Sequence, residues 1–387
     1  MRPVALLTYS TKPRGGVVHT LELAEALAEI GVPVHVLALG EPGGRFFRPI
    51  RVPHTLIQGP IGATTLEEKV AGGIDCLEAG LIDVVAAQPE IILHAQDCLS
   101  ARAAARVRDS GTGVPVVRTV HHVDDFSTPM LRDCQRKAIL EPDLVLVVTD
   151  VWRRILAVDY GVHAGVVPNG VDVARYASAA PKRATELRAM AAPDGRPLVL
   201  AVGGIEPRKG TADLVRAVAG MPSRPVLAIV GGHSFQDYRA YKDAVLAELP
   251  GLGLELDRDI VLLGTVPDQD MAAWYAAADA LAFPSAKEGF GLAVLEAMSA
   301  GLPVVTSNLP VFREYLVDGR DALLVELGDV AGLTRALEAV LTDVGLRTRL
   351  VARGRAVAGR FTWQRSAQRH VEIYAGLPAP GAPAALT

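Results

Sequence analysis

The stretch VALLTYSTKPRGGVVHTLELAEALAEIGVPVHVLAL, residues 4–39, decides the fold of this chain. A short apolar run at 4–9 is followed by a longer helical pattern at 20–31 and by a second apolar run at 34–39. Runs that are apolar on both faces are typical of strands buried in a parallel sheet. The stretch therefore predicts a strand, a helix and a parallel strand, the repeating unit of an α/β protein.

The same alternation continues along the chain in two series. The first series adds the apolar runs IILHAQ, VPVVRTV and DLVLVVT, and a second series starts after residue 195 with PLVLAVGG, PVLAIVGG, DIVLLGTV, DALAFPS and LPVVTS. Two parallel sheets with helices on both faces are therefore predicted. In residues 168–197 turn formers and small residues give way to a short charged helix and another Pro/Gly break, and this segment is expected to link the two domains. The Pro/Ala-rich end, 377–387, is expected to be a flexible tail.

Length and composition exclude several classes of protein. The chain has 387 residues, enough for two domains, and its net charge of −4 and pI near 6.2 give no general attraction for nucleic acid. Cys76, Cys98 and Cys134 are few and widely spaced, so neither a disulfide framework nor a zinc site is indicated. No signal peptide or membrane-spanning run is recognisable. A cytoplasmic protein is expected, with at most peripheral membrane contact.

In open α/β sheets ligands bind beyond the carboxyl ends of the strands, so the loops there are the candidate sites. The first such loop, STKPRGGVVHT at 10–20, places Gly15 and Gly16 at the start of a helix, where free amides favour an anion. These glycines could equally serve only a tight turn, and their spacing does not match the dinucleotide-binding fingerprint G-x-G-x-x-G. A nicotinamide-binding domain is therefore disfavoured.

A second loop, VGGIEPRKGT at 202–211, places Arg208 and Lys209 just before a predicted helix. Cations are unfavourable at a helix N-terminus, so this position suggests an anionic ligand such as a phosphate. The alternative is that both are ordinary surface charges.

A third loop, AKEGFGLAVLEAM at 286–298, carries Glu288 and Glu296 around two glycines. A helix is predicted from about Leu292 to Ala300, and its first amides would face a diphosphate while the two carboxylates accept hydrogen bonds from hydroxyls of the same ligand. The alternative is that Glu288 caps the helix and Glu296 faces solvent. The backbone expected to approach the ligand comprises Gly289, Phe290, Gly291 and Leu292.

A fourth loop, VRTVHHVDDF at 117–126, ends a buried strand with His121 and His122, followed by Asp124 and Asp125. Adjacent strand residues point to opposite faces, so the two histidines are unsuited to sharing a metal ion. One histidine facing the ligand is the favoured interpretation, and no metal site is expected.

These loops together resemble the retaining glycosyltransferases of the GT-B fold, the large family that includes sucrose, mannosyl and glycogen synthase-like enzymes. The most specific match is residues 262–325, including the E-x7-E element formed by Glu288 and Glu296. The segment VVPNGVD at 166–172 is similar to the family's crossover between domains, and FTWQRSAQRHVEIY at 361–374 resembles the helix that returns to the first domain.

The resemblance implies two Rossmann-like domains facing each other across a cleft. The N-terminal, acceptor-side domain would comprise 1–172, completed by a helix at about 361–376, and the donor domain would comprise 173–360. A gating motion is expected near Asn169.

The resemblance also implies a role for each candidate residue. Glu288 would lie near the donor sugar's hydroxyls and Glu296 on the ribose, with Arg208 and Lys209 on the diphosphate. On the first domain, Gly16 would lie beside the diphosphate and His121 near the transferred sugar. The base would be held largely through backbone by the loops at Gly231, Gly232 and Val266.

The sequence departs from the family at two positions. Gly204 stands where the phosphate loop of the family usually has an arginine, and Arg208 is expected to supply the missing charge. His122 occupies the position of the family's usual acidic residue after the first-domain histidine.

The predicted function is metal-independent, retaining transfer of a hexose from a nucleotide-diphosphate sugar to an acceptor hydroxyl. UDP-glucose and GDP-mannose are both reasonable donors, and the loop at Phe46, Phe47 and Arg48 with segment 55–75 is expected to shape the acceptor side. Two alternatives remain open at this point: a nucleotide-sugar epimerase of the same fold, and a non-catalytic nucleotide-sugar binding protein.

Overall fold

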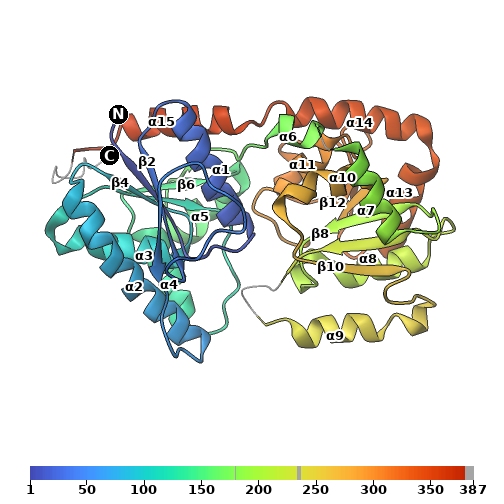
Figure 1. Ribbon diagram of the computed structural model, residues 1–387, viewed down its shortest axis with the longest axis horizontal. Coiled ribbons are helices and arrows are strands. Elements are labelled where there is room, and N and C mark those ends of the chain that lie inside the picture. The colour runs from blue at the N-terminus through green and yellow to red at the C-terminus, as the bar shows by residue number, and fades with distance from the viewer. Residues whose placement is uncertain (179, 233–236, 380–387) are drawn as a thin grey trace. The chain divides into compact units, whose positions relative to one another are not determined.

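The computed structural model describes residues 1–178, 180–232 and 237–379, so most of the predicted tail lies outside the described residues. The chain divides into two compact units (Figure 1). Unit 1 comprises Met1–Gly170 and Trp363–Thr387, and unit 2 comprises Val171–Thr362.

Unit 1 contains a seven-stranded parallel sheet in the order β3-β2-β1-β4-β5-β6-β7. The central strands are buried on both faces, which explains their continuous apolar runs. The strands are β1 (Val4–Thr8), β2 (Val34–Gly40), β3 (His54–Gln58), β4 (Ile92–Ala95), β5 (Val116–Val120), β6 (Leu144–Val147) and β7 (Gly165–Val166).

Helices cover this sheet, and capping residues fix where several of them begin. Thr65 and Glu68 form a reciprocal capping box at the start of α2, and Asp97 caps α3 by accepting from the amide of Ser100. Helix α15, from the end of the chain, lies beside α1 (Figure 1). The helices are α1 (Gly15–Glu29), α2 (Leu66–Ala87), α3 (Cys98–Val107), a π-helical turn (Arg108–Thr112), α4 (Pro129–Leu140), α5 (Asp150–Tyr160) and α15 (Trp363–Ala375).

Unit 2 contains a six-stranded parallel sheet in the order β10-β9-β8-β11-β12-β13. Chain order reverses between β8 and β11, because β9 and β10 extend the sheet on one side of β8 and the later strands extend it on the other. The strands are β8 (Leu198–Val202), β9 (Val226–Val230), β10 (Ile260–Gly264), β11 (Ala280–Phe283), β12 (Val304–Ser307) and β13 (Leu323–Val325).

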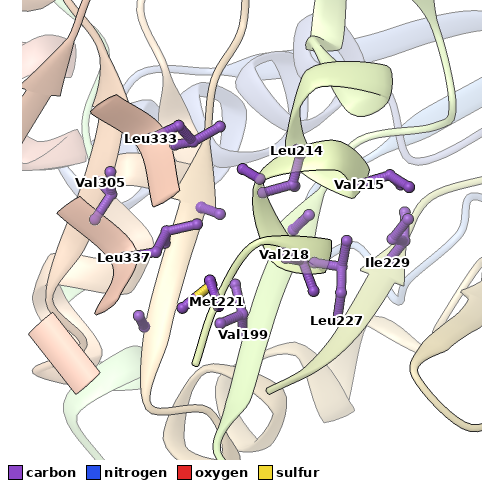
Figure 2. Packing of buried hydrophobic residues seen from close by; sticks show 14 of the residues in the cluster. Val199, Leu214, Val215, Val218, Met221, Leu227, Ile229, Val305, Leu333 and Leu337 are labelled. Atoms are coloured by element: carbon purple, nitrogen blue, oxygen red, sulfur yellow. The ribbon is translucent and has the colours of Figure 1, made fainter. Parts of the chain in front are cut away.

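The core of unit 2 lies between this sheet and two helices, α8 and α13 (Figure 2). Leu214 and Val218 of α8 and Leu333 and Leu337 of α13 belong to one buried cluster with side chains of β8, β9 and β12. The helices of unit 2 are α6 (Val173–Ala177), α7 (Pro181–Ala191), α8 (Thr211–Ala219), α9 (Arg239–Ala247), α10 (Met271–Ala277), α11 (Leu292–Ala300), α12 (Pro310–Arg313), α13 (Val330–Thr342) and α14 (Val344–Ala358), with 3-10 turns at Pro207–Lys209, Pro250–Leu252 and Asp268–Asp270.

The structure adds three strands that the sequence analysis did not predict. β3, β7 and β13 all lie at sheet edges. β3 is largely exposed, and β7 is only two residues long. An edge strand pairs on one side only and needs no apolar surface on both faces, so the pattern that revealed the central strands is absent.

The segment 168–197 contains the boundary between the two units, after Gly170, and the rest of it belongs to unit 2. Most of it forms α6 and α7, which pack within unit 2 on α10 and α11. Tyr176 and Leu187 are buried there. The connection itself is shorter than the segment suggests, because these apolar side chains are sparse among small and charged residues and the helices look solvated in sequence alone.

Candidate active site

The predicted loops of unit 2 come together at the carboxyl ends of β8, β9, β10 and β11, around the strands where chain order reverses. Three of the loops are joined by main-chain hydrogen bonds. The amide of Gly203 donates to Val230 O at 2.7 Å, and the amide of Gly231 donates to Gly264 O at 2.9 Å. This is the part of an open α/β sheet at which ligands bind.

Glycines are required where these loops meet. Gly231 has φ +155°, and a Cβ there would lie 2.5 Å from the carbonyl carbon of Gly203. A Cβ on Gly232 would lie 2.2 Å from Thr265 Oγ1, next to the half-buried Val266. Gly204 is less constrained: its φ is not positive, and an added Cβ would approach Gly232 O at 3.0 Å. The backbones of these loops therefore pack directly against one another.

Gly231→Ala is expected to destabilise unit 2 by at least about 1–3 kcal/mol, because the φ is unfavourable for alanine and its Cβ meets backbone. We expect nucleoside diphosphate binding to weaken with it. The control is Gly251→Ala, where a Cβ meets nothing within 4 Å. Thermal unfolding and titration with UDP measure both effects, and equal behaviour of the two variants would contradict this account of the loops.

A partly buried charge cluster lies between the second and third loops. Lys209 Nζ is 2.7 Å from Glu288 Oε1, and Arg208 Nη1 is 3.6 Å from the same oxygen. Arg208 Nε also pairs with Glu206 Oε2 at 3.0 Å. The side chain of Lys209 is 14% exposed and that of Arg208 39%, so Lys209 is the more enclosed cation. Its stem passes over Gly203, where a Cβ would lie 2.8 Å from Lys209 Cε.

The cluster keeps Glu288 ionised. Burial acts to raise the pKa of the Glu288 carboxyl, but Lys209 and Arg208 outweigh it, and the pKa lies below its ordinary value. With Glu206, the four side chains carry two positive and two negative charges. An arriving diphosphate would compete with Glu288 for Lys209, which leaves the carboxylate available to hydroxyl donors.

The N-terminus of α11 adds main-chain donors. Gly291 precedes the helix with φ +93°, and a Cβ there would lie 2.5 Å from the ring of Phe312. Phe290 is buried, with its ring stacked on Tyr315 at 5.4 Å between centroids. The side chain thus anchors the loop. The amide of Val294 donates to Gly291 O at 3.0 Å, whereas the amides of Leu292 and Ala293 precede any intrahelical acceptor and can bind an anion.

Glu296 engages a different cluster from Glu288. Tyr275 donates from its hydroxyl to Glu296 Oε2 at 2.6 Å, and Tyr176 also hydrogen-bonds this carboxylate. Burial raises the pKa of Glu296, against the lowering effect of these two hydrogen bonds. The alternative in which Glu288 caps the helix and Glu296 faces solvent is wrong, because Gly291 occupies the N-cap and both carboxylates are held inside unit 2.

Unit 1 places His121 beside the start of α1. His121 Nε2 lies 3.1 Å from Gln96 Oε1, and a Cβ on Gly16 would lie 3.7 Å from His121 Cδ2. Gly15 begins α1 with open space around it. Burial, followed by the influence of His19, holds the pKa of His121 well below its ordinary value, so the ring is neutral at physiological pH. Gln96, which sequence reasoning missed, is buried after β4.

His122 pairs with Asp124 at 3.2 Å, separately from the His121 contact. Within the described ranges, no three His, Cys, Asp or Glu side chains are grouped so as to hold a metal ion. The same part of the chain contains no helix with the length and apolar character needed to cross a membrane.

The loop expected to shape the acceptor side has largely structural contacts. Phe46 is buried against His54, and Arg48 pairs with Glu22 and Glu25 of α1 at 3.0 and 2.9 Å. Phe47 is only half-buried. Removing Phe46 would therefore disturb the core of unit 1, and only Phe47 offers a clean test of an acceptor role.

Other residues of the site gave no recognisable signal in sequence. Tyr176 and Tyr275 lie about a hundred positions apart along the chain, yet their rings meet edge to face at 5.6 Å beside Glu296. Glu206 is buried next to Arg208. Only tertiary packing brings these side chains to the two glutamates.

Family models match both parts of the chain. Residues 13–175 match the model described as Glycosyltransferase Family 4, and residues 196–343 match Glycosyl transferases group 1. The chain is 30% identical over 418 residues to a D-inositol 3-phosphate glycosyltransferase of Actinosynnema mirum, with 97% of each chain covered. It is 29% identical to the protein of the same name from Xylanimonas cellulosilytica, with 96% of each covered.

Solved structures resemble this fold across nearly the whole chain. The Anabaena protein HepE, in complex with UDP and glucose, matches with a TM-score of 0.82 at 21% identity, covering 97% of this chain and 100% of that one. Sucrose-phosphate synthase of Thermosynechococcus elongatus matches with a TM-score of 0.80 at 21% identity, covering 97% and 98%.

The two parallel sheets, with their loops at the carboxyl ends, form a GT-B fold. The chain belongs to glycosyltransferase family 4, the group 1 glycosyl transferases. It is a retaining enzyme that uses a nucleotide sugar. This decides between the three functions left open by the sequence in favour of sugar transfer over epimerisation or binding alone.

Proposed function

We propose that this enzyme transfers a hexose from a UDP-sugar to a hydroxyl of a small phosphorylated polyol, without a metal ion. The donor part of this proposal rests on the partly buried cluster of Lys209, Arg208 and Glu288 beside the N-terminus of α11. It combines two cations and main-chain amides for a diphosphate with a carboxylate for sugar hydroxyls.

Each site residue has a role in this proposal. Lys209, Arg208 and the amides at 290–292 stabilise the departing diphosphate, Glu288 binds hydroxyls of the donor sugar, and Glu296 binds the ribose. Arg208 supplies the charge that the family's arginine would provide at Gly204, and its ion pair with Glu288 supports this.

The remaining assignments rest on the family resemblance. Gly16 lies beside the diphosphate, and His121, being neutral, exchanges hydrogen bonds with the sugar as it is transferred. The loops at Gly231, Gly232 and Val266 hold the base through main-chain atoms.

The reaction replaces one bond at the anomeric carbon by another. The bond to the β-phosphate oxygen breaks, the bond to the acceptor oxygen forms on the same face, and the acceptor proton passes to the departing phosphate. Retention in this scheme requires no protein nucleophile. The main demand on the protein is stabilisation of charge on the leaving diphosphate, which fixed cations and amides meet without reorganisation.

We take the proposed donor and acceptor from the names of proteins that this chain resembles. HepE was solved with UDP-glucose, and relatives sharing 28–31% identity are named D-inositol 3-phosphate glycosyltransferase. UDP-sugars and D-inositol 3-phosphate are therefore the first donor and acceptor to test, with GDP-mannose as the competing donor.

The test is a thermal-shift panel of UDP, GDP, ADP and TDP, with and without chelator, followed by transfer assays from the sugar of whichever diphosphate binds. We expect UDP to stabilise the protein equally with and without chelator, and UDP-glucose to glycosylate D-inositol 3-phosphate. Stabilisation by GDP alone would overturn the donor assignment. Transfer to unphosphorylated inositol but not to its phosphate would overturn the acceptor assignment, and loss of binding with chelator would overturn metal independence.

A further inference from the structure

A second histidine, His19, packs against His121 in unit 1 and has no role in the proposed reaction. It sits on α1, one turn after Gly16, and is 1% exposed. Its neighbours on the buried face of α1 are mainly apolar, and an aliphatic side chain would satisfy that packing. Burying an imidazole costs free energy unless its polar atoms are used, so a histidine at this position needs a reason.

The ring of His19 contacts the ring of His121 directly. The centroids are 4.7 Å apart, and the planes meet edge to face at 71°. Among the described residues, the ring of His121 hydrogen-bonds to Gln96, at 3.1 Å, and a single hydrogen bond leaves the ring free to pivot. The contact with His19, together with the close backbone of Gly16, removes that freedom.

His19 also contacts both places where the chain passes between the units. Its Nδ1 lies 2.9 Å from Oδ1 of Asn169, one residue before the first stretch of unit 1 ends. Its ring lies 5.4 Å, edge to face, from that of Trp363, where the chain re-enters unit 1. Because an amide oxygen only accepts, Nδ1 donates, and this hydrogen bond fixes the ring's tautomer and orientation.

We propose that His19 is a positioning residue for the transferase reaction. It holds the ring of His121 in the orientation that the reaction needs, and it links that ring to Asn169 and Trp363, which lie where the chain passes between the units. The inference rests on the proposed role of His121 near the transferred sugar. His19 itself touches no substrate, so its effect on the reaction passes through His121.

Two substitutions separate the contacts of His19. His19→Asn keeps a donor near the position of Nδ1 but removes the ring from His121, whereas His19→Phe keeps a ring and removes the donor to Asn169. The matched control is Tyr374→Phe, which removes the hydroxyl that meets His94 Nδ1 at 2.6 Å in the same histidine-rich core. It perturbs the same core at His94 and His370, the rings that Tyr374 meets, rather than at His121.

A double-mutant cycle with His121→Ala tests the coupling. With UDP-glucose and D-inositol 3-phosphate, we expect His19→Asn to lower kcat on the order of 10- to 100-fold, with the affinity for UDP unchanged. In the His121→Ala background the same change should cost little further, because the ring it positions is gone. Equal losses in both backgrounds would mean a purely structural role and would overturn the proposal. So would an unchanged kcat in His19→Asn.

A readout without substrate keeps this test separate from that of the proposed function. In histidine-labelled protein, the ring resonance of His121, identified by its loss in His121→Ala, should shift in both His19 variants and stay in place in Tyr374→Phe. An unmoved resonance in the His19 variants would contradict the proposal whatever the substrate. A shifted resonance in a protein that transfers no sugar would instead count against the proposed function alone.

Discussion

Replacing Lys209 by methionine is expected to lower kcat for sugar transfer by about 100- to 1,000-fold, the usual cost of removing one preorganised donor to a charged leaving group. Lys209 is the enclosed cation of the cluster, 2.7 Å from Glu288. Methionine retains the stem that packs over Gly203 and loses the ammonium group, whose Nζ lies 4.6 Å from the centroid of the Phe283 ring. The loss should therefore come from the missing charge. Initial rates at saturating donor measure it.

Changing Glu288, the other member of this ion pair, is expected to strengthen the binding of UDP. In Glu288→Gln the carboxylate no longer competes for Lys209, so UDP alone should bind several-fold more tightly while transfer from UDP-glucose falls. Lys242→Met, an exposed lysine on α9, is the control for the methionine substitution. Tighter UDP binding by Lys209→Met, or weaker binding by Glu288→Gln, would show that the cluster does not hold the diphosphate.

Acidification from pH 7 to pH 5 is expected to unfold unit 1 before unit 2. Burial lowers the pKa of His19 to about 3 and that of His370 to about 4, and it holds His94 and His121 well below 6.5. Eight of the nine histidines, all but His233, lie within the sequence ranges of unit 1. The acid sensitivity of the protein should therefore be concentrated in that unit.

The sign follows from proton binding. In the unfolded chain each of these histidines binds a proton near pH 6.5, whereas in the folded unit it stays neutral, so stability is full above pH 6.5 and is lost as pH falls toward the folded pKa. Each neutral histidine contributes a slope of about 1.4 kcal/mol per pH unit. For His370, between 6.5 and about 4, this amounts to about 3 kcal/mol. Arg118, buried nearby, adds repulsion to protonated His94 and His121.

Calorimetry at pH steps between 7.5 and 5 measures this effect. We expect two unfolding transitions, one for each unit, whose midpoint temperatures separate as the pH falls. His370→Leu is the matched variant: the slope of the transition assigned to unit 1 should fall by about one histidine's share, about 1.4 kcal/mol per pH unit. A slope that is the same in the variant, or an acid-sensitive transition that belongs to unit 2, would contradict the assignment to the buried histidines.

The candidate site was predicted from sequence to an uneven degree. Gly291, the two cations and the two glutamates were singled out because their residue types and spacing are unusual for plain structure, whereas Gly231 was named only through the family resemblance. Tyr176 and Tyr275 were not found, because a tyrosine in an apolar helix looks like core packing until its hydroxyl is seen to meet Glu296. Phe46 was assigned to the acceptor side and proved to be core, because exposure cannot be judged inside an irregular loop.

By itself the sequence determined that the chain forms two parallel α/β sheets and where most of their strands lie. Buried parallel strands must be apolar on both faces, so each of them can be recognised from its own short run of apolar residues. The position of the candidate loops follows from the same rule, since all strands of a parallel sheet end at one edge.

Only the tertiary structure decided which side chains meet at that edge. It showed that Lys209 pairs with Glu288, that Glu296 belongs to a separate tyrosine cluster, and that His19 joins His121 to Asn169. These contacts link residues from 21 to 150 positions apart, where the chain connectivity imposes no distance. Their geometry arises from the packing of whole helices and strands, and no local pattern of residues encodes it.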